Sequence, residues 1–164
     1  MKNLFLLLIG SLVGSTVMAQ LKTTPLCPEI TINIMEGNIN NVIQPNSTQG
    51  LIEKTFPCYT GDEPEGDSSK CGGTVTYADK DLVFYTGRDY IEIRQNFKGK
   101  LSIPLLGAAR SSLFQWLGYP KIKDVQWDAF QTAYGILILY YGSDSKVNKI
   151  QMSTKSVNSI KLCD

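Results

Sequence analysis

The spacing of hydrophobic and polar residues in the stretch "LLGAARSSLFQWLGYPKI" predicts a short amphipathic helix. Leu113, Trp116 and Leu117 are spaced at i, i+3 and i+4, so they share one face of that helix. Gly118 can adopt the positive φ that is common just after a helix end, and Pro120 cannot continue a helix. We therefore expect the helix to stop here and to need a sheet or a second helix to cover its apolar face.

The residues that follow predict an antiparallel meander. The segment "WDAFQTAY" (127–134) is rich in strand-forming residues, and "ILILYY" (136–141) is continuously apolar. After a turn, "VNKIQM" (147–152) alternates between apolar and polar residues. A last strand at 157–162 would close the sheet. The predicted order is a helix, a loop and strands that pair in sequence.

The first half of the chain shows the same order. A short helix is expected in 46–57, where Asn46 and Gln49 have the spacing of a capping box. Three strand-like segments follow it, at 73–79, 81–87 and 90–94. We interpret the two halves as a degenerate tandem repeat of about 60 residues, a period typical of repeated structural units. The alternative is two unrelated halves that share a pattern by chance.

These patterns predict an α+β fold built from two tandem modules. Each module would consist of a helix, a loop and an antiparallel meander, with the helices packed on one face of a sheet. The modules would span residues 20–96 and 97–164. The alternating Ile30, Ile32 and Ile34 could form one more strand before the first helix.

Residues 1–19 have the pattern of a secretory signal peptide. Lys2 precedes the apolar run "LFLLLIGSLVG", which is too short to span a membrane, and "VMA" before Gln20 has the small residues of a cleavage site. An uncleaved N-terminal anchor is the alternative. We expect a mature chain that begins near Gln20, contains no transmembrane segment and is located in the periplasm or outside the cell.

The four cysteines predict two disulfides. An even number of cysteines in an exported chain is typical of disulfide bonding, and three pairings are possible. We favour Cys58–Cys71, because these residues flank a polar loop between the first helix and the first meander strand. Cys27–Cys163 would then join the two ends of the chain, which often lie close together in a domain. None of the cysteines has CxxC spacing, so a redox motif or zinc knuckle is not expected.

The chemistry of the chain argues against catalysis. Histidine is absent, which excludes Ser-His-Asp and Cys-His activation of a nucleophile and removes the commonest neutral metal ligand. The acidic segment 61–67 offers oxygen atoms for Ca²⁺ but lacks the form of an EF-hand, so we interpret it as a solvated loop. No nucleophile-elbow or phosphate-loop motif is present. We expect no catalytic residue, no metal, no cofactor and no enzyme activity.

Charge and aromatic residues indicate a protein partner. Without Lys2 the chain has 15 basic residues (16 minus 1) and 15 acidic residues, so no basic surface for nucleic acid is expected. Aromatic residues are frequent in the predicted strands, and we expect Tyr85, Trp127 and Tyr141 to be exposed and to contact a protein target. The alternative is that a flanking segment such as 20–45 covers this face of the sheet.

The motif formed by Gly107, Leu113, the pair Leu117-Gly118 and Pro120 resembles the helix signature of small envelope modules of the BamE/SmpA type. The family of β-lactamase inhibitor proteins is similar and contains two such modules in tandem. The resemblance covers about 104–152.

The first half of the chain departs from this motif. Phe56 and Pro57 stand where Leu-Gly-x-Pro would be, and the chain also lacks the acylated N-terminal cysteine of the BamE-type lipoproteins. The resemblance therefore implies an exported, non-enzymatic protein-binding module that acts as an inhibitor or as an immunity-type protein. The alternative is an envelope assembly or scaffold module of the BamE/SmpA type.

Overall fold

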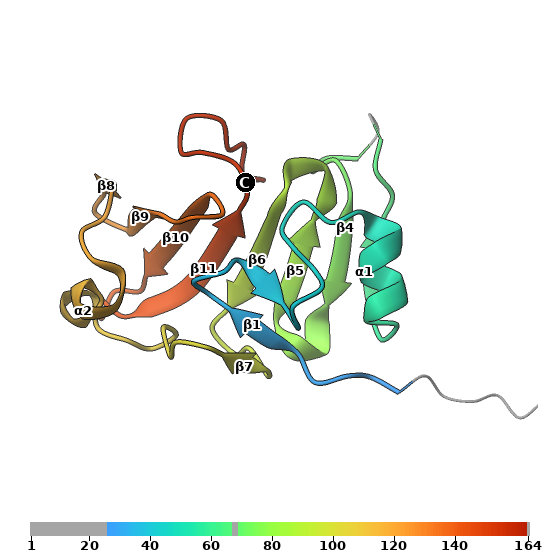
Figure 1. Cartoon of the computed structure of the whole chain (residues 1–164), viewed down its shortest axis with the longest axis horizontal. Helices are drawn as coiled ribbons and strands as arrows, with labels where there is room; N and C mark the ends of the chain where they lie inside the picture. The colour runs from blue at the N-terminus through green and yellow to red at the C-terminus, as the bar shows by residue number, and fades with distance from the viewer. Residues whose placement is uncertain (1–25, 67–68, 164) are drawn as a thin grey trace, which may run out of the picture.

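The computed structural model describes residues 26–66 and 69–163 (Figure 1). The predicted signal peptide lies outside these residues. Among the helices in the described part of the chain, none is long and apolar enough to cross a membrane.

The main element of the described chain is one antiparallel sheet of eight strands. Its strands are β3 (Gly61–Glu63), β4 (Thr74–Tyr77), β5 (Leu82–Tyr85), β6 (Tyr90–Arg94), β8 (Ile122–Lys123), β9 (Trp127–Gln131), β10 (Ile136–Tyr141) and β11 (Val147–Ser153). Their order in space is β3-β4-β5-β6-β11-β10-β9-β8. The strands from the two halves of the chain therefore meet at the β6–β11 pair, which runs from Arg94 opposite Lys149 to Tyr90 opposite Ser153.

A second, smaller sheet lies across the first. It consists of β1 (Thr31–Asn33), β2 (Asn38–Ile39) and β7 (Lys100–Leu101) in the order β2-β1-β7. The β1 strand is antiparallel to β2 and parallel to β7. Figure 1 shows β1 in front of the central strands of the large sheet, with β7 beside β1.

In residues 26–66 and 69–163, helical structure is limited to two short α-helices and three 3₁₀ turns. The helices are α1 (Gln49–Thr55) and α2 (Phe114–Leu117), and the 3₁₀ turns span Ala78–Lys80, Thr86–Arg88 and Arg110–Ser112. Residue Thr48, and not the predicted Asn46, is the N-cap of α1. The α2 helix has only four residues, so it cannot cover a sheet.

The predicted fold of two helix-packed tandem modules is wrong, because the molecule is mostly β and is built around one continuous sheet. Both predicted meanders form, as β4–β6 and β9–β11, but they are joined edge to edge at β6 and β11. This pairing satisfies backbone groups that two separate meanders would leave exposed at their edges. The predicted strand at 157–162 does not form, since its first residues make a turn.

Isoleucines of the N-terminal segment, rather than helices, cover most of one face of the large sheet, which we call the first face. Ile30, Ile32 and Ile34 are almost completely buried, as are Ile39 and Ile43. They pack with residues of α1 and with the sheet residues that point to this side. Those sheet residues are Val75, Tyr77, Leu82, Phe84, Ile91, Ile93, Phe130, Leu137, Leu139, Val147, Ile150 and Met152.

The opposite side of the sheet, the second face, is partly covered by the C-terminal segment 154–163, which we call the strap. Val157, Ile160 and Leu162 of the strap pack on a buried cluster of Ala129, Ile136 and Ile138. Burying these apolar groups explains why the strap lies on the sheet even though it forms no strand in the described residues.

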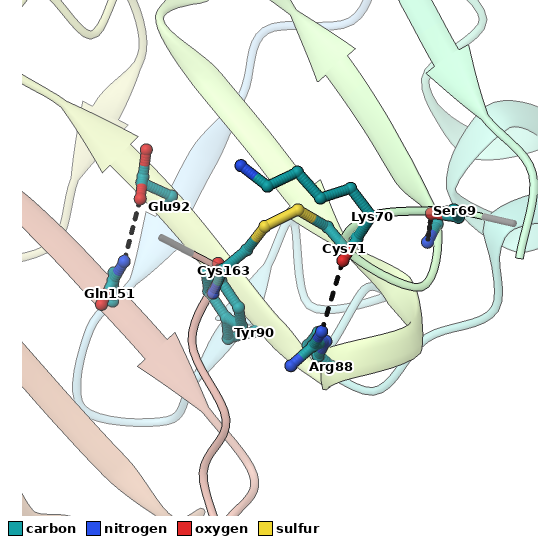
Figure 2. The surroundings of a disulfide bond; sticks show 9 residues. Ser69, Lys70, Cys71, Arg88, Tyr90, Glu92, Gln151 and Cys163 are labelled. Carbon is teal, nitrogen blue, oxygen red and sulfur yellow. Dashed lines mark hydrogen bonds between the residues drawn. A yellow bond between two sulfur atoms is a disulfide. The ribbon is translucent and has the colours of Figure 1, made fainter. Parts of the chain in front are cut away.

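The two disulfides differ from the predicted pairs, which are wrong. The structure joins Cys27 to Cys58, with the Cα atoms 5.7 Å apart, and Cys71 to Cys163, with the Cα atoms 5.5 Å apart. The prediction failed because the strap carries Cys163 across the second face, to the loop that precedes β4 (Figure 2). Two disulfides are typical of proteins from an oxidising compartment.

Candidate functional site

Exposed apolar side chains gather on α2 and on the residues that lead through β8 to β9. We call this region the α2–β8 surface. It contains half of the large apolar side chains that are exposed in the described part of the chain. They are Phe114 (58% exposed), Trp116 (38%), Tyr119 (86%), Ile122 (36%) and Val125 (86%). Large exposed apolar patches on soluble proteins are most often sites of interaction.

The shortness of α2 explains this exposure. Leu113 is buried and Leu117 packs against the core, so they anchor the helix to the first face. Trp116 was expected on the same buried face, but it is exposed. A helix of four residues can direct only one or two side chains toward the core. Phe114 projects outward and packs against Tyr119, with the ring centroids 5.6 Å apart.

Gly118 ends α2 and redirects the chain toward β8. It has the positive φ that the sequence predicted, 70°, but its ψ of −152° lies outside the left-handed helical region. Only glycine adopts this conformation readily. Pro120 follows two residues later and lines the same surface as Tyr119. The chain can therefore leave α2 abruptly and expose the segment 119–126.

A cleft of about 490 Å³ lies between α2 and the first face of β8 and β9. Phe114 and Tyr119 form part of its wall, and Phe130 is one of the residues beneath it. Lys123 and Lys146 also line the cleft. The cleft therefore combines aromatic rings with ammonium groups, which suits an apolar ligand group beside negative charge.

A partly buried ion pair joins two sides of this cleft. The Arg110 guanidinium donates hydrogen bonds to both carboxylate oxygens of Asp128, and Nε lies 2.9 Å from Oδ2. Arg110 also donates to the carbonyl oxygens of Asp124 and Val125, at 2.6 and 3.2 Å. The hydrogen bond to Asp128 raises the pKa of Arg110 and keeps it charged. Arg110 therefore ties the turn between β8 and β9 to the segment that precedes α2.

Tyr141, one of the three predicted contact residues, belongs to this partly buried cluster. Its hydroxyl group donates to Oδ2 of Asp128 at 2.7 Å. The guanidinium of Arg110 lies 4.6 Å from the centre of the Tyr141 ring. Burial raises the pKa of the Tyr141 hydroxyl. Tyr141 thus supports the cleft from within, on the first face.

Tyr85, the second predicted residue, lies on the second face. Its ring stacks on that of Tyr90 in the neighbouring strand, with centroids 4.3 Å apart. The Tyr90 hydroxyl accepts a hydrogen bond from the backbone N–H of Cys163, at 2.9 Å, so the strap reaches this pair (Figure 2). Tyr85 is partly exposed beside the end of the strap.

Trp127, the third predicted residue, is also on the second face but on a distant strand. In the register of the sheet, Trp127 is opposite Tyr140 of β10. Tyr140 is opposite Lys149 of β11, and Lys149 is opposite Arg94 of β6. The Lys149 ammonium lies 4.1 Å from the centre of the Tyr140 ring. Three strands separate β9 from β5, so Trp127 and Tyr85 do not form one cluster. The structure therefore does not bring the three predicted residues together.

The centre of the second face contains a polar network around Glu92, which is 5% exposed. Its carboxylate accepts hydrogen bonds from Arg94 Nε at 2.7 Å and from Gln151 Nε2 at 2.8 Å. The Lys149 ammonium lies 3.7 Å away, and Gln151 accepts a hydrogen bond from the Tyr140 hydroxyl. Figure 2 shows the Glu92–Gln151 contact. Like Asp128, Glu92 is neutralised by a neighbouring cation, so its carboxylate is held in a structural role.

Sequence patterns did not predict the α2–β8 surface. Tyr119 and Val125 lie in loops, where periodicity says nothing about exposure. The one available signal was the density of aromatic residues around a helix too short to bury them all.

No model of a protein family matches the chain, and neither do the curated proteins or the solved structures with which it was compared.

Proposed function

We propose that the mature chain is an exported, non-enzymatic protein that binds another protein through the α2–β8 surface and inhibits or neutralises it. The observation that carries this proposal is the exposure of Phe114 and Tyr119 in the wall of a cleft, with Trp116, Ile122 and Val125 exposed nearby in the chain. Aromatic side chains around a concave site commonly dominate the binding energy of protein interfaces.

The contacts that hold the cleft together support this function. Arg110 and Asp128 hold both sides of the cleft, and α2 is anchored by Leu113. A surface that is already ordered loses little conformational entropy on binding, which favours tight association. The two disulfides suit a protein that acts in the periplasm or outside the cell.

The chemistry of the described residues supports a non-enzymatic role. The two buried carboxylates, Glu92 and Asp128, accept hydrogen bonds from arginines and are engaged in contacts within the fold. The chain also lacks histidine.

Site-specific photocrosslinking tests the proposal. The photoreactive residue p-benzoylphenylalanine replaces Tyr119 in one variant and Val42, an exposed apolar residue outside the α2–β8 surface, in a matched control. Irradiation of exported protein should give a crosslinked partner from position 119 only, and Phe114→Ala in the same chain should weaken the crosslink. The purified partner should then lose activity when the wild-type protein is added. Equal crosslinking from both positions, or none, would contradict the proposal.

A further inference from the structure

The β8 strand offers an open edge beside the cleft. It is the last strand in the order of the large sheet, so its outer edge has no strand partner among the described residues. Residues 121–126 are all exposed. Along a strand, the backbone N–H and C=O groups of alternate residues point to opposite sides, so one of the two residues of β8 directs these groups away from β9. An extended chain could pair with them.

The register of β8 determines which side chains of an added strand would meet the cleft. Lys123 is aligned with Asp128 and therefore lies on the first face, where the cleft is. Ile122 is aligned with Ala129 and lies on the second face. Because side chains alternate along a strand, every second side chain of a strand added beside β8 would lie over the cleft.

The charges around the cleft favour an acidic strand. Arg110 and Asp128 pair with each other, so the remaining charged groups in the lining are two lysines, Lys123 and Lys146, and one carboxylate, Asp144, with a net positive charge. The ion pairs of the described residues include neither Lys123 nor Lys146. Two ammonium groups are thus available for carboxylates of a partner. Lysines on an open edge also disfavour pairing with the same edge of a second copy.

We infer that β8 binds an extended, acidic segment of the partner protein as an additional strand, with one large apolar side chain of that segment in the cleft beneath Phe114 and Tyr119. Backbone hydrogen bonds would supply affinity, and the cleft with its two lysines would supply specificity. The inference rests on the proposed function, because it names the kind of segment that the α2–β8 surface recognises.

A phage-displayed library of random peptides, selected on the full disulfide-bonded protein, tests this inference. Selected peptides should share an aromatic or large aliphatic residue with Asp or Glu two positions away on either side. The Kd of a synthetic consensus peptide should rise on the order of tenfold in Lys123→Glu/Lys146→Glu. A matched charge-reversal control, Lys54→Glu/Lys98→Glu, changes two exposed lysines elsewhere and should leave the Kd unchanged.

Methylation of single backbone nitrogens in the consensus peptide reports on strand addition directly. Binding should be lost at alternate positions only, because only alternate N–H groups would face β8. The inference is overturned if no peptide is selected, or if the selected peptides lack acidic residues two positions from the apolar one. It is also overturned if Lys123→Glu/Lys146→Glu and Lys54→Glu/Lys98→Glu bind the peptide with the same Kd, or if the effect of methylation does not repeat every two residues. Persistent crosslinking from position 119 together with any of these results would leave the proposed function standing and reject only the added strand.

Discussion

Two buried tyrosine hydroxyls show how much one hydrogen bond matters in this core. The Tyr77 hydroxyl donates to the Phe56 carbonyl oxygen at 2.7 Å, and it ties α1 to β4. The Tyr134 hydroxyl forms no hydrogen bond of normal geometry within the described residues. Tyr77→Phe should lower the free energy of unfolding by about 1 kcal/mol, whereas Tyr134→Phe should leave it unchanged or raise it slightly. Urea denaturation of both variants measures this, and an equal loss in the two would contradict it.

Buried tyrosines also predict sensitivity to alkali. Burial is the main cause that raises the pKa of Tyr77, Tyr90 and Tyr134 above the ordinary value of about 10. The unfolded chain therefore loses these protons at a lower pH than the folded chain. Their contribution to stability is complete below about pH 10 and is lost as the pH rises toward the folded pKa values. The melting temperature should fall above pH 10, less steeply in Tyr134→Phe. A fall of equal steepness in this variant would contradict the assignment.

Two exposed glycines should respond to alanine in opposite directions. Gly50 lies in α1 with open space around its Cα, so Gly50→Ala should stabilise the protein by about 0.5–1 kcal/mol. Gly118 also has open space, but its φ of 70° and ψ of −152° exclude side chains, so Gly118→Ala should destabilise by about 1–3 kcal/mol. Thermal unfolding distinguishes the two. A neutral Gly118→Ala would show that the chain can leave α2 in another conformation.

Among the elements, those with several residues of regular pattern could be predicted. The β10 strand and its neighbours carry long apolar or alternating runs, so both meanders were found. The short strands β2, β7 and β8 have two residues each, which is too few to show a period. Because β8 forms the open edge of the candidate site, the site itself was missed.

Register explains why the predicted contact residues did not fall together. Trp127 is opposite Tyr140, so Tyr140 shares its face, whereas the adjacent Tyr141 lies on the other face. A difference of one residue in a strand changes the face, and the sequence alone does not fix the pairing of distant strands. The disulfide pairs failed for a similar reason, since the path of the strap depends on which apolar surface of the sheet is left uncovered.

The two disulfides should differ in their effect on stability. The Cys27–Cys58 bond closes 31 residues and the Cys71–Cys163 bond closes 92, which corresponds to about 3.7 and about 4.6 kcal/mol in the chain-entropy model. Replacing Cys71 and Cys163 by alanine should therefore lower stability by about 1 kcal/mol more than replacing the other pair.

Hydrogen exchange supplies the control for the disulfide comparison. Only the Cys71→Ala/Cys163→Ala variant releases the end of the strap, so only this variant should exchange faster at Ile136 and Ile138, which the strap covers. Faster exchange at these residues in the Cys27→Ala/Cys58→Ala variant would show that the strap does not depend on its own disulfide.

At the scale of the whole molecule, the two halves of the chain are joined in three ways across the predicted boundary between 96 and 97. The β6 strand pairs with β11 along five residues, and β1 pairs with β7. The Cys71–Cys163 disulfide joins the loop before β4 to the strap. The core on the first face is likewise shared, because one cluster contains residues from both halves. Without the other half, β6 or β11 would lose its partner strand, and the isoleucines of the shared core would be exposed.

We therefore expect the oxidised protein to unfold in a single cooperative transition. Calorimetry should give equal calorimetric and van't Hoff enthalpies, since no part of the shared core can melt alone. Residues 20–96 and 97–164, produced as separate chains, should each lack the dispersed amide spectrum of a folded protein, because β6 and β11 would each become an open apolar edge. Mixing the two chains under oxidising conditions should restore some folded protein through the β6–β11 pair and the Cys71–Cys163 bond. Two separate transitions, or one half that folds alone, would show that the pairing at β6 and β11 joins two independent units.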